Sequence, residues 1–454
     1  MGIESIEKFS FRYLLLKLYG KFWHDYIFYK KVVYVNRDSV PWDQHLIFTP
    51  NHQNALMDAL AIELSWSNQF VFVARSDIFK KKFIARLLYF LKILPVYRIR
   101  DGYDSLKKNE ITFKKTLDII RNKNGFVIMP EGNHAGFRRL RPLRKGFARI
   151  AFQAEEATGY SLDIKLIPVG ISYSNYENFR SDLLVIFGEP VSVSEFYEDY
   201  KESPAVAYNK IKIVLSEKMK PLMIEIESDE NYEVIDLLRG MYEKFGARHL
   251  GLKPNKLYEQ FKTHKAIIKV LEQEERAESN DFRVLAEKTK TYIKNMAELK
   301  LNPTVFGKNA GNWFCFIFKT LLLILGFPFF IYGLINNGLP YFPTFRITRL
   351  FKDRQFHSSF KFGIPFFLTP VFYLLQTLLV FAVSGSIIWA GYYLISLPLS
   401  AIIAWKYSRL YLNTLIDFRI IRNRNRDQFK ESKRLYQELL KQTDQLFKKN
   451  LNSE

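Results

Sequence analysis

Short apolar runs alternate with helical stretches between about residues 45 and 195. The spacing of apolar residues predicts helices over 55–65, 79–91, 105–121 and 146–157. Five apolar runs have the length of buried strands: Leu46–Thr49, Phe70–Ala74, Gly125–Met129, Lys165–Ser172 and Leu183–Phe187. Strands separated by helices of this length predict an α/β domain with a mainly parallel sheet, which we assign to residues 41–199. In such domains, active sites lie on loops at the carboxyl ends of the strands.

The stretch before this domain, residues 11–34, is apolar and aromatic, but five lysines and arginines interrupt it. So much charge argues against a spanning helix and is typical of an amphipathic segment in the headgroup region of a membrane. An amphipathic helix packed on the α/β domain would show the same pattern. We interpret residues 1–40 as an amphipathic, membrane-associated segment.

The part of the chain that follows the α/β domain changes character twice. Residues 200–305 are charged, helix-favouring and poor in glycine, and we expect a helical extension there. From 313 to 335 the only charged residue is Lys319, and from 362 to 405 there is none. A spanning helix needs about 20 apolar residues, so the second run is long enough for two helices, and Gly385 and the serines near it are candidates for the turn. The alternative, a helical hairpin buried in a soluble protein, would need an uncharged run of unusual length.

These runs predict a membrane region over 306–410, followed by a basic tail over 411–454. Both the tail and the loop before residue 362 are basic, so the positive-inside rule places them in the cytoplasm. Segment 313–335 is either spanning or re-entrant. Only a re-entrant segment, broken near Gly326 and Pro328, would keep the α/β domain on the cytoplasmic side as well.

The charge balance indicates an anionic partner, because 67 lysines and arginines stand against 46 aspartates and glutamates, a net charge of +21. Anionic lipid, phosphorylated substrates and nucleic acid share this property. We expect no nucleic acid, because no nucleic-acid motif is present and the uncharged run would serve no purpose there. The seven histidines are scattered, so we expect no metal site, and Cys315 is the only cysteine.

Candidate chemistry begins where the first predicted strand meets the first predicted helix, in the sequence Phe-Thr-Pro-Asn-His-Gln-Asn-Ala-Leu-Met-Asp. His52 is placed to act as a general base, since the pKa of a histidine lies near working pH. Asp58 is placed to hold its second ring nitrogen. Six residues along one ideal helix would put the two side chains on different faces. The pair therefore requires that His52 precede the helix and that Asp58 lie within its first turns.

Three further segments follow at strand–loop junctions. Leu-Pro-Val-Tyr-Arg-Ile-Arg contains Arg98 and Arg100, which are suited to gripping a phosphate. Val-Ile-Met-Pro-Glu-Gly ends in a turn with Glu131 and Gly132, where the carboxylate would bind substrate hydroxyls or orient the loop. The basic stretch after it, up to Lys145, would attract phosphate or form a solvated basic face. The last segment, Leu-Ile-Pro-Val-Gly at 166–170, is a strand opening into a loop.

These four segments, in this order, resemble the glycerolipid acyltransferase family, which acylates glycerol-3-phosphate and lysophosphatidic acid. The resemblance covers residues 40–195, roughly a third of the chain. It implies that His52 is the general base and Asp58 its partner, and that Arg98 contacts the substrate phosphate. It also implies that Glu131 and Gly132 form the acceptor-binding turn and that Pro168 lies near the acyl donor. Arg100 and Lys145 are additional candidates for substrate binding.

The sequence departs from the family pattern at two places. Five residues separate His52 from Asp58, where most bacterial members have four. This spacing, with Asn54 two places after the histidine, is similar to that of the eukaryotic endoplasmic-reticulum glycerol-3-phosphate acyltransferases, which also carry hydrophobic segments after the catalytic domain. Asn133 and His134 stand where the family usually has a small hydroxyl residue and often an arginine, which leaves the acceptor open.

The resemblance thus implies an α/β acyltransferase domain with a helical extension and C-terminal transmembrane helices, integral to the membrane and facing the cytoplasm. The expected reaction transfers a fatty acyl chain from acyl-CoA or acyl carrier protein to glycerol-3-phosphate or 1-acylglycerol-3-phosphate. It needs no cofactor and no metal, and its partners are membrane lipids and these substrates. Two alternatives remain: acyl transfer to another lysolipid, and a non-catalytic membrane protein that binds lipid.

Overall fold

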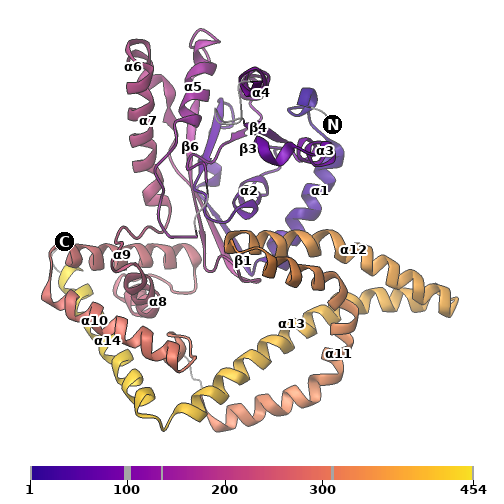
Figure 1. Cartoon of the computed structure of the whole chain (residues 1–454), viewed down its shortest axis with the longest axis vertical. Helices are drawn as coiled ribbons and strands as arrows, with labels where there is room; N and C mark the ends of the chain where they lie inside the picture. The colour runs from indigo at the N-terminus through magenta and orange to yellow at the C-terminus, as the bar shows by residue number, and fades with distance from the viewer. Residues whose placement is uncertain (1–2, 97–103, 134–135, 308–310, 452–454) are drawn as a thin grey trace. The chain divides into compact units, whose positions relative to one another are not determined.

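The structure is a computed structural model that describes residues 3–96, 104–133, 136–307 and 311–451 (Figure 1). It divides into two compact units. The first is Met1–Glu225 together with Phe351–Phe362, and the second is Ile226–Leu350 together with Gly363–Glu454. Segment 351–362 therefore belongs to the first unit, although it joins two helices whose greater parts belong to the second.

An eight-stranded sheet forms the centre of the first unit, in the order β1-β7-β6-β2-β5-β3-β4 with β8 beside β6. Neighbouring strands from β6 to β4 are parallel, whereas β6 runs antiparallel to both β7 and β8. The predicted mainly parallel α/β fold is therefore confirmed. The strands are β1 Lys31–Val35, β2 Leu46–Pro50, β3 Val71–Arg75, β4 Ile93–Val96, β5 Phe126–Val127, β6 Lys165–Tyr173, β7 Asp182–Phe187 and β8 Val191–Ser192.

Helices of the first unit cover this sheet and supply its core. Buried residues of α5, including Phe147 and Phe152, pack in one cluster with the buried strands β2 and β6. Each of the four helices and five strands predicted from apolar spacing is present within a few residues of its expected bounds. The helices are α1 Phe11–Phe22, α2 Leu56–Glu63, α3 Lys82–Phe90, α4 Asp104–Arg121, α5 Gly146–Glu156, α6 Tyr197–Glu202 and α7 Pro204–Met219.

The amino-terminal helix α1 packs on the α/β domain and leaves an apolar face exposed. One face of α1 packs on the domain and buries Tyr13 and Lys17. The opposite face exposes Phe11, Leu15 and Leu18 to solvent in this structure. Downstream of α1, β1 pairs in parallel with β7, so residues 31–35 are part of the sheet and not of an amphipathic segment.

The first unit also extends further along the chain than residue 199. Helix α7 buries Ala207, Ile211 and Leu215 in the same core cluster as the sheet. An apolar face with a helical spacing of four residues explains why this helix packs on the sheet despite its charged outer surface.

The second unit contains a helical bundle and a group of long apolar helices. In the bundle, the Tyr242 hydroxyl of α8 donates a 2.7 Å hydrogen bond to Asp444 of α14, so the basic tail is an ordered helix of this bundle. The helices of this unit are α8 Tyr232–His249, α9 Leu257–Arg276, α10 Asn280–Glu298, α11 Trp313–Leu350, α12 His357–Ser384, α13 Ile387–Asn423 and α14 Asp427–Leu451.

Three helices in the described part of the chain, α11, α12 and α13, are long and apolar enough to cross a membrane. Apolar side chains along all three face outward, as in helices that contact lipid. The chain turns between α12 and α13 at Gly385, which has a φ of +62° that favours glycine. Gly385 is one of the candidates that the sequence offers for a turn within 362–405.

Contacts among these helices are polar as well as apolar. Helix α11 lies antiparallel to α13, because Lys319 pairs with Asp417 at 2.6 Å and the Tyr332 hydroxyl lies 2.6 Å from Ser396 Oγ. In the middle of α11, Asn337 donates to Ser400 of α13 at 3.0 Å and accepts from the Tyr373 hydroxyl of α12 at 2.6 Å. Asn337 therefore joins all three helices at one level along their lengths.

Candidate active site

The loop between β2 and α2, residues 51–55, carries the predicted histidine. It emerges from the carboxyl end of β2, a fully buried strand between β6 and β5. Ala55 precedes the helix with a φ of +45°, a region that non-glycine residues rarely adopt. This conformation lets the chain reverse before α2 starts at Leu56. Such backbone strain persists only where surrounding contacts hold it.

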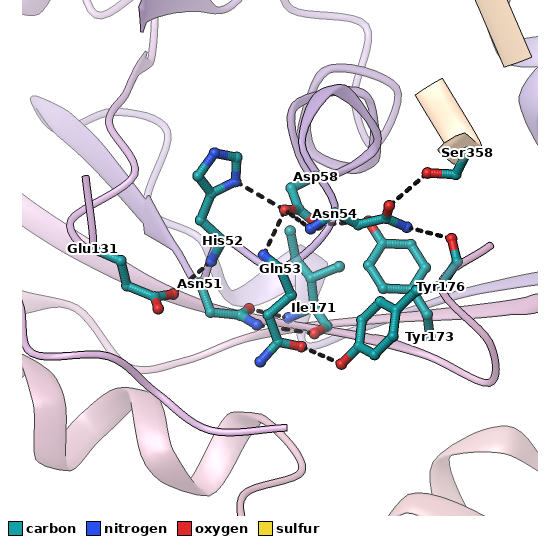
Figure 2. Close-up of polar contacts among 10 residues, drawn as sticks. All are labelled: Asn51, His52, Gln53, Asn54, Asp58, Glu131, Ile171, Tyr173, Tyr176 and Ser358. Atoms are coloured by element: carbon teal, nitrogen blue, oxygen red, sulfur yellow. Dashed lines mark hydrogen bonds and ion pairs between the residues drawn. The ribbon is translucent and has the colours of Figure 1, made fainter. Parts of the chain in front are cut away.

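His52 and Asp58 meet across this loop (Figure 2). His52 Nδ1 lies 2.9 Å from Asp58 Oδ2. Asp58 stands in the first turn of α2, where the helix dipole favours a carboxylate. The structure thus meets both conditions that the six-residue spacing imposes: the histidine precedes the helix and the aspartate lies near its start.

Asp58 is fully buried, and each of its oxygens accepts hydrogen bonds. Besides His52, its Oδ2 accepts from the backbone N–H groups of Gln53 at 2.8 Å and Asn54 at 2.6 Å. Its Oδ1 accepts from the Tyr173 hydroxyl at 2.7 Å. A buried carboxylate with this many donors is held in one orientation.

This arrangement determines the protonation pattern of the histidine. Since Asp58 only accepts, His52 Nδ1 must carry the proton and donate it. The other ring nitrogen, Nε2, then has its lone pair on the side of the ring away from the carboxylate. The side chain of His52 is 17% exposed, so a substrate hydroxyl can reach it. The pair can therefore take a proton from an alcohol and stabilise the resulting imidazolium.

The other polar side chains of the loop fasten it to β6 and to the residues after β6. The Asn51 amide exchanges two hydrogen bonds with the backbone of Ile171, at 3.1 and 2.6 Å. The Tyr176 hydroxyl donates to Gln53 Oε1 at 2.6 Å, and Asn54 Nδ2 donates to the Tyr176 carbonyl at 3.1 Å. These bonds fix the backbone that carries His52.

Glu131 lies in the turn that follows β5 and contacts the His52 loop. Its Oε1 accepts from the His52 backbone N–H at 2.6 Å, and its Oε2 accepts from the Arg141 backbone N–H at 3.0 Å. Burial raises the pKa of Glu131 to about 7, although both backbone donors oppose this shift. Of the two roles considered from the sequence, these contacts match the one in which the carboxylate orients the loop.

The glycine and the basic stretch after Glu131 form the neighbouring rim. Gly132 has a φ of +68°, and a side chain there would press against Arg144. The Arg144 N–H donates to the Pro130 carbonyl at 2.7 Å, which ties the basic stretch to the Pro-Glu-Gly turn. Lys145 is exposed at the start of α5. Glu131, which accepts from the backbone of both Arg141 and His52, thus holds the basic stretch next to the His52 loop.

Other predicted residues lie elsewhere. Arg98, Arg100 and His134 fall outside the described residues. The strand before the two arginines, β4, is parallel to β3 and therefore ends at the same sheet edge as β2. Pro168 lies buried within β6 opposite Thr49, and the strand continues to Tyr173. The strand therefore ends one residue beyond the predicted end at Ser172, and the loop follows.

Several residues of the site carry no signal that the sequence analysis used. Tyr173 and Tyr176 belong to the end of β6 and its loop, and Ser358 contacts Asn54 from segment 351–362. Tyr173 could have been identified from its position, because its hydroxyl lies at the carboxyl end of the strand that neighbours β2. Among the described residues, no group of three or more histidine, cysteine, aspartate or glutamate side chains could hold a metal ion.

Comparison with known proteins adds relatives to this geometry. Residues 31–172 match the Acyltransferase family model. Glycerol-3-phosphate O-acyltransferase 2 of Saccharomyces cerevisiae is 27% identical over 141 residues, which are 31% of this chain and 19% of that protein. Glycerol-3-phosphate O-acyltransferase 1 of the same yeast is 24% identical over 133 residues, 29% of this chain and 17% of that protein. The match thus spans about a fifth of the length of these curated relatives.

A solved structure is also similar. The crystal structure of the 1-acyl-sn-glycerophosphate (LPA) acyltransferase PlsC from Thermotoga maritima aligns with a TM-score of 0.30 and 19% sequence identity. The alignment covers 48% of this chain and 79% of that chain.

Proposed function

We propose that this chain, which carries at residues 31–172 an acyltransferase domain of the glycerolipid acyltransferase family, is a membrane-bound glycerol-3-phosphate O-acyltransferase. The observation that carries the proposal is the His52–Asp58 pair, with the Asp58 carboxylate buried and fully hydrogen-bonded and His52 accessible. Two yeast relatives named for acyl transfer to glycerol-3-phosphate support this acceptor over lysophosphatidic acid. So does the five-residue spacing between histidine and aspartate.

The proposed reaction is direct transfer between two bound substrates. His52 Nε2 removes the proton from a glycerol hydroxyl, and that oxygen attacks the thioester carbonyl of acyl-CoA or acyl carrier protein. The C–S bond then breaks, and the imidazolium returns its proton to the leaving thiolate. Asp58 stabilises the imidazolium between these steps. Holding both substrates at His52 supplies a large part of the rate in such reactions.

The phosphate would be bound by arginines and lysines at the same sheet edge. Arg98 and Arg100 follow β4, which lies three strands from β2, or about 14 Å at the usual strand spacing. Lys145 ends the basic stretch, which follows the Pro-Glu-Gly turn and is hydrogen-bonded to it. Arginine suits this role because its planar fork pairs with two phosphate oxygens.

An activity assay with both acceptors tests the proposal. The full chain, purified in detergent, is given palmitoyl-CoA with glycerol-3-phosphate or with lysophosphatidic acid, and products are measured by lipid mass spectrometry. We expect lysophosphatidic acid from glycerol-3-phosphate, and a large rise in the Michaelis constant for this acceptor in Arg98→Ala. Product only from lysophosphatidic acid would mean that this lipid, and not glycerol-3-phosphate, is the acceptor. If neither acceptor gives product with palmitoyl-CoA or with acyl carrier protein as donor, the proposed reaction is wrong.

We also propose that α11 is re-entrant, so that the acyltransferase domain and α14 share the cytoplasmic side. Helix α12 runs from segment 351–362 to Gly385, and α13 returns from there. Lys319 near the start of α11 pairs with Asp417 near the end of α13, so the start of α11 lies beside the end of α13. The other end of α11, Leu350, is joined to the start of α12 by only six residues, 351–356. Arginines and lysines are concentrated at these ends, as the positive-inside rule requires of the cytoplasmic side.

Cysteine labelling checks this topology, because the chain has a single cysteine. In a Cys315→Ser background, single cysteines are placed at Asn312, Lys352 and Ser384 and exposed to a membrane-impermeant maleimide in sealed vesicles of known orientation. We expect positions 312 and 352 to react from the cytoplasmic side and 384 from the other. Reaction of 312 and 352 from opposite sides would mean that α11 crosses the membrane completely.

A further inference from the structure

We propose that Ser358, in the first turn of α12, is a positioning residue for the His52–Asp58 pair. The inference rests on the proposed function, since it concerns the same histidine. It adds a residue from the first turn of α12, far along the chain from the acyltransferase motifs.

The contact that motivates the proposal is a buried hydrogen bond. Ser358 Oγ donates to Asn54 Oδ1 at 2.5 Å, and each of the two residues is only 1% exposed (Figure 2). The Asn54 side chain has a second bond, from its Nδ2 to the Tyr176 carbonyl. Its amide is therefore held from both ends, by the first turn of α12 and by the loop after β6.

Asn54 transmits this restraint to the catalytic pair through its backbone. Its N–H donates to Asp58 Oδ2 at 2.6 Å, on the same oxygen that faces His52 Nδ1. The next residue, Ala55, has the strained positive φ that lets the N–H groups of the loop converge on Asp58. Without Ser358, Asn54 Oδ1 would be buried without this donor, and the loop could relax away from Asp58.

Segment 351–362 is itself anchored to the first unit, so Ser358 does not depend on Asn54 for its place. Lys361 Nζ donates to the Glu177 carbonyl at 2.9 Å, and Arg354 Nε pairs with the Glu177 carboxylate at 2.8 Å. Phe362 packs edge-on against Phe28, with ring centroids 5.3 Å apart. The start of α12 is therefore fixed to the domain that bears His52.

The chain contains a matched control for Ser358. Ser359 is the next residue and is also buried, but within the described residues its hydroxyl has no hydrogen-bond partner. Replacing either serine with alanine removes one buried oxygen at nearly the same place. Only Ser358→Ala removes a bond to the loop that carries His52.

We expect Ser358→Ala in the full chain to lower kcat by roughly three- to tenfold, while KM for palmitoyl-CoA stays unchanged. Backbone amides of residues 52–56 should exchange hydrogen faster in this variant, measured by mass spectrometry without substrate. Ser359→Ala should match the wild type in both measurements. The exchange measurement remains informative if the wild type acylates neither acceptor, so failure of the proposed function can be distinguished from failure of this inference.

Equal kcat and equal exchange in the two alanine variants would overturn the proposal. Should Ser358→Ala fail to fold, Lys361→Met provides the second test, because it loosens the segment from Glu177 and leaves the Asn54 contact atoms in place. Faster exchange at 52–56 in Lys361→Met supports the proposal. Unchanged exchange there contradicts it.

Discussion

Replacing His52 with alanine is expected to lower kcat by about 10²–10⁴-fold, the usual contribution of a general base. The substitution removes Nε2, the ring nitrogen that would accept the hydroxyl proton, and leaves Asp58 without the imidazolium that it would stabilise. The fold should persist, because Asp58 keeps its bonds from Gln53, Asn54 and Tyr173. The measurement is the turnover of palmitoyl-CoA with glycerol-3-phosphate, together with circular dichroism of the purified variant.

His45→Ala is the matched control for this variant. His45 precedes β2, at the opposite end of the strand from His52, and its Nδ1 contacts the Ile120 carbonyl at 2.8 Å. It should retain turnover close to that of the wild type. If His52→Ala kept near-full activity while folded, the assignment of the general base would be wrong, and direct transfer at this loop would have to be abandoned.

The second large effect concerns the stability of the first unit. Lys17 of α1 pairs with Glu63 of α2 at 2.7 Å, and both side chains are almost completely buried. Lys17→Met leaves Glu63 without its cation, and breaking a buried pair in this way costs about 3–5 kcal/mol of unfolding free energy. We expect the loss at pH 8, measured by thermal or denaturant unfolding in detergent.

The size of this loss should depend on pH. Burial raises the pKa of Glu63 to about 7 in the folded protein, above its ordinary value of 4.5. The folded state therefore binds more protons than the unfolded state between these values, and stability falls as the pH rises through this range. In Lys17→Met the deficit should shrink at pH 5, where Glu63 is neutral.

Lys21→Met provides a control on the same helix. Lys21 also pairs with a carboxylate, Asp25, but its side chain is 41% exposed. Exposed pairs contribute about 0–1 kcal/mol, so this variant should unfold close to the wild type. Equal losses in both variants would show that the methionine, and not the loss of a buried cation, causes the destabilisation.

Much of the first unit could be predicted from the sequence, because its strands and helices are recorded in the spacing of apolar residues. Buried strands such as β2 and β7 are continuous apolar runs, and helices such as α5 repeat apolar residues every three or four positions. The motif around His52 and Asp58 is equally local, since both residues lie on one strand–loop–helix passage. Active sites of α/β sheets lie at the carboxyl ends of strands, so the position of this motif after a strand also marks it as a candidate site.

Elements at the margins of the sheet could not be predicted in this way. Strand β1 begins with Lys31 and has no fully buried residue, so its sequence looks amphipathic and its pairing with β7 depends on the assembled sheet. Strand β4 has only four residues, one of them Pro95, too few for a pattern to emerge. For both strands the neighbour in the sheet, and not the local sequence, decides the structure.

The sequence by itself determined a mainly parallel α/β domain, an uncharged run long enough for two helices, and a histidine and an aspartate that can pair only across a strand–helix junction. Only the tertiary structure decided what holds that pair in place. The donor to Asp58 Oδ1 comes from Tyr173, 115 residues away, and the donor to Asn54 comes from Ser358, 304 residues away. Periodicity and short motifs describe neighbours along the chain, whereas these bonds arise only after the sheet has brought distant segments to one edge.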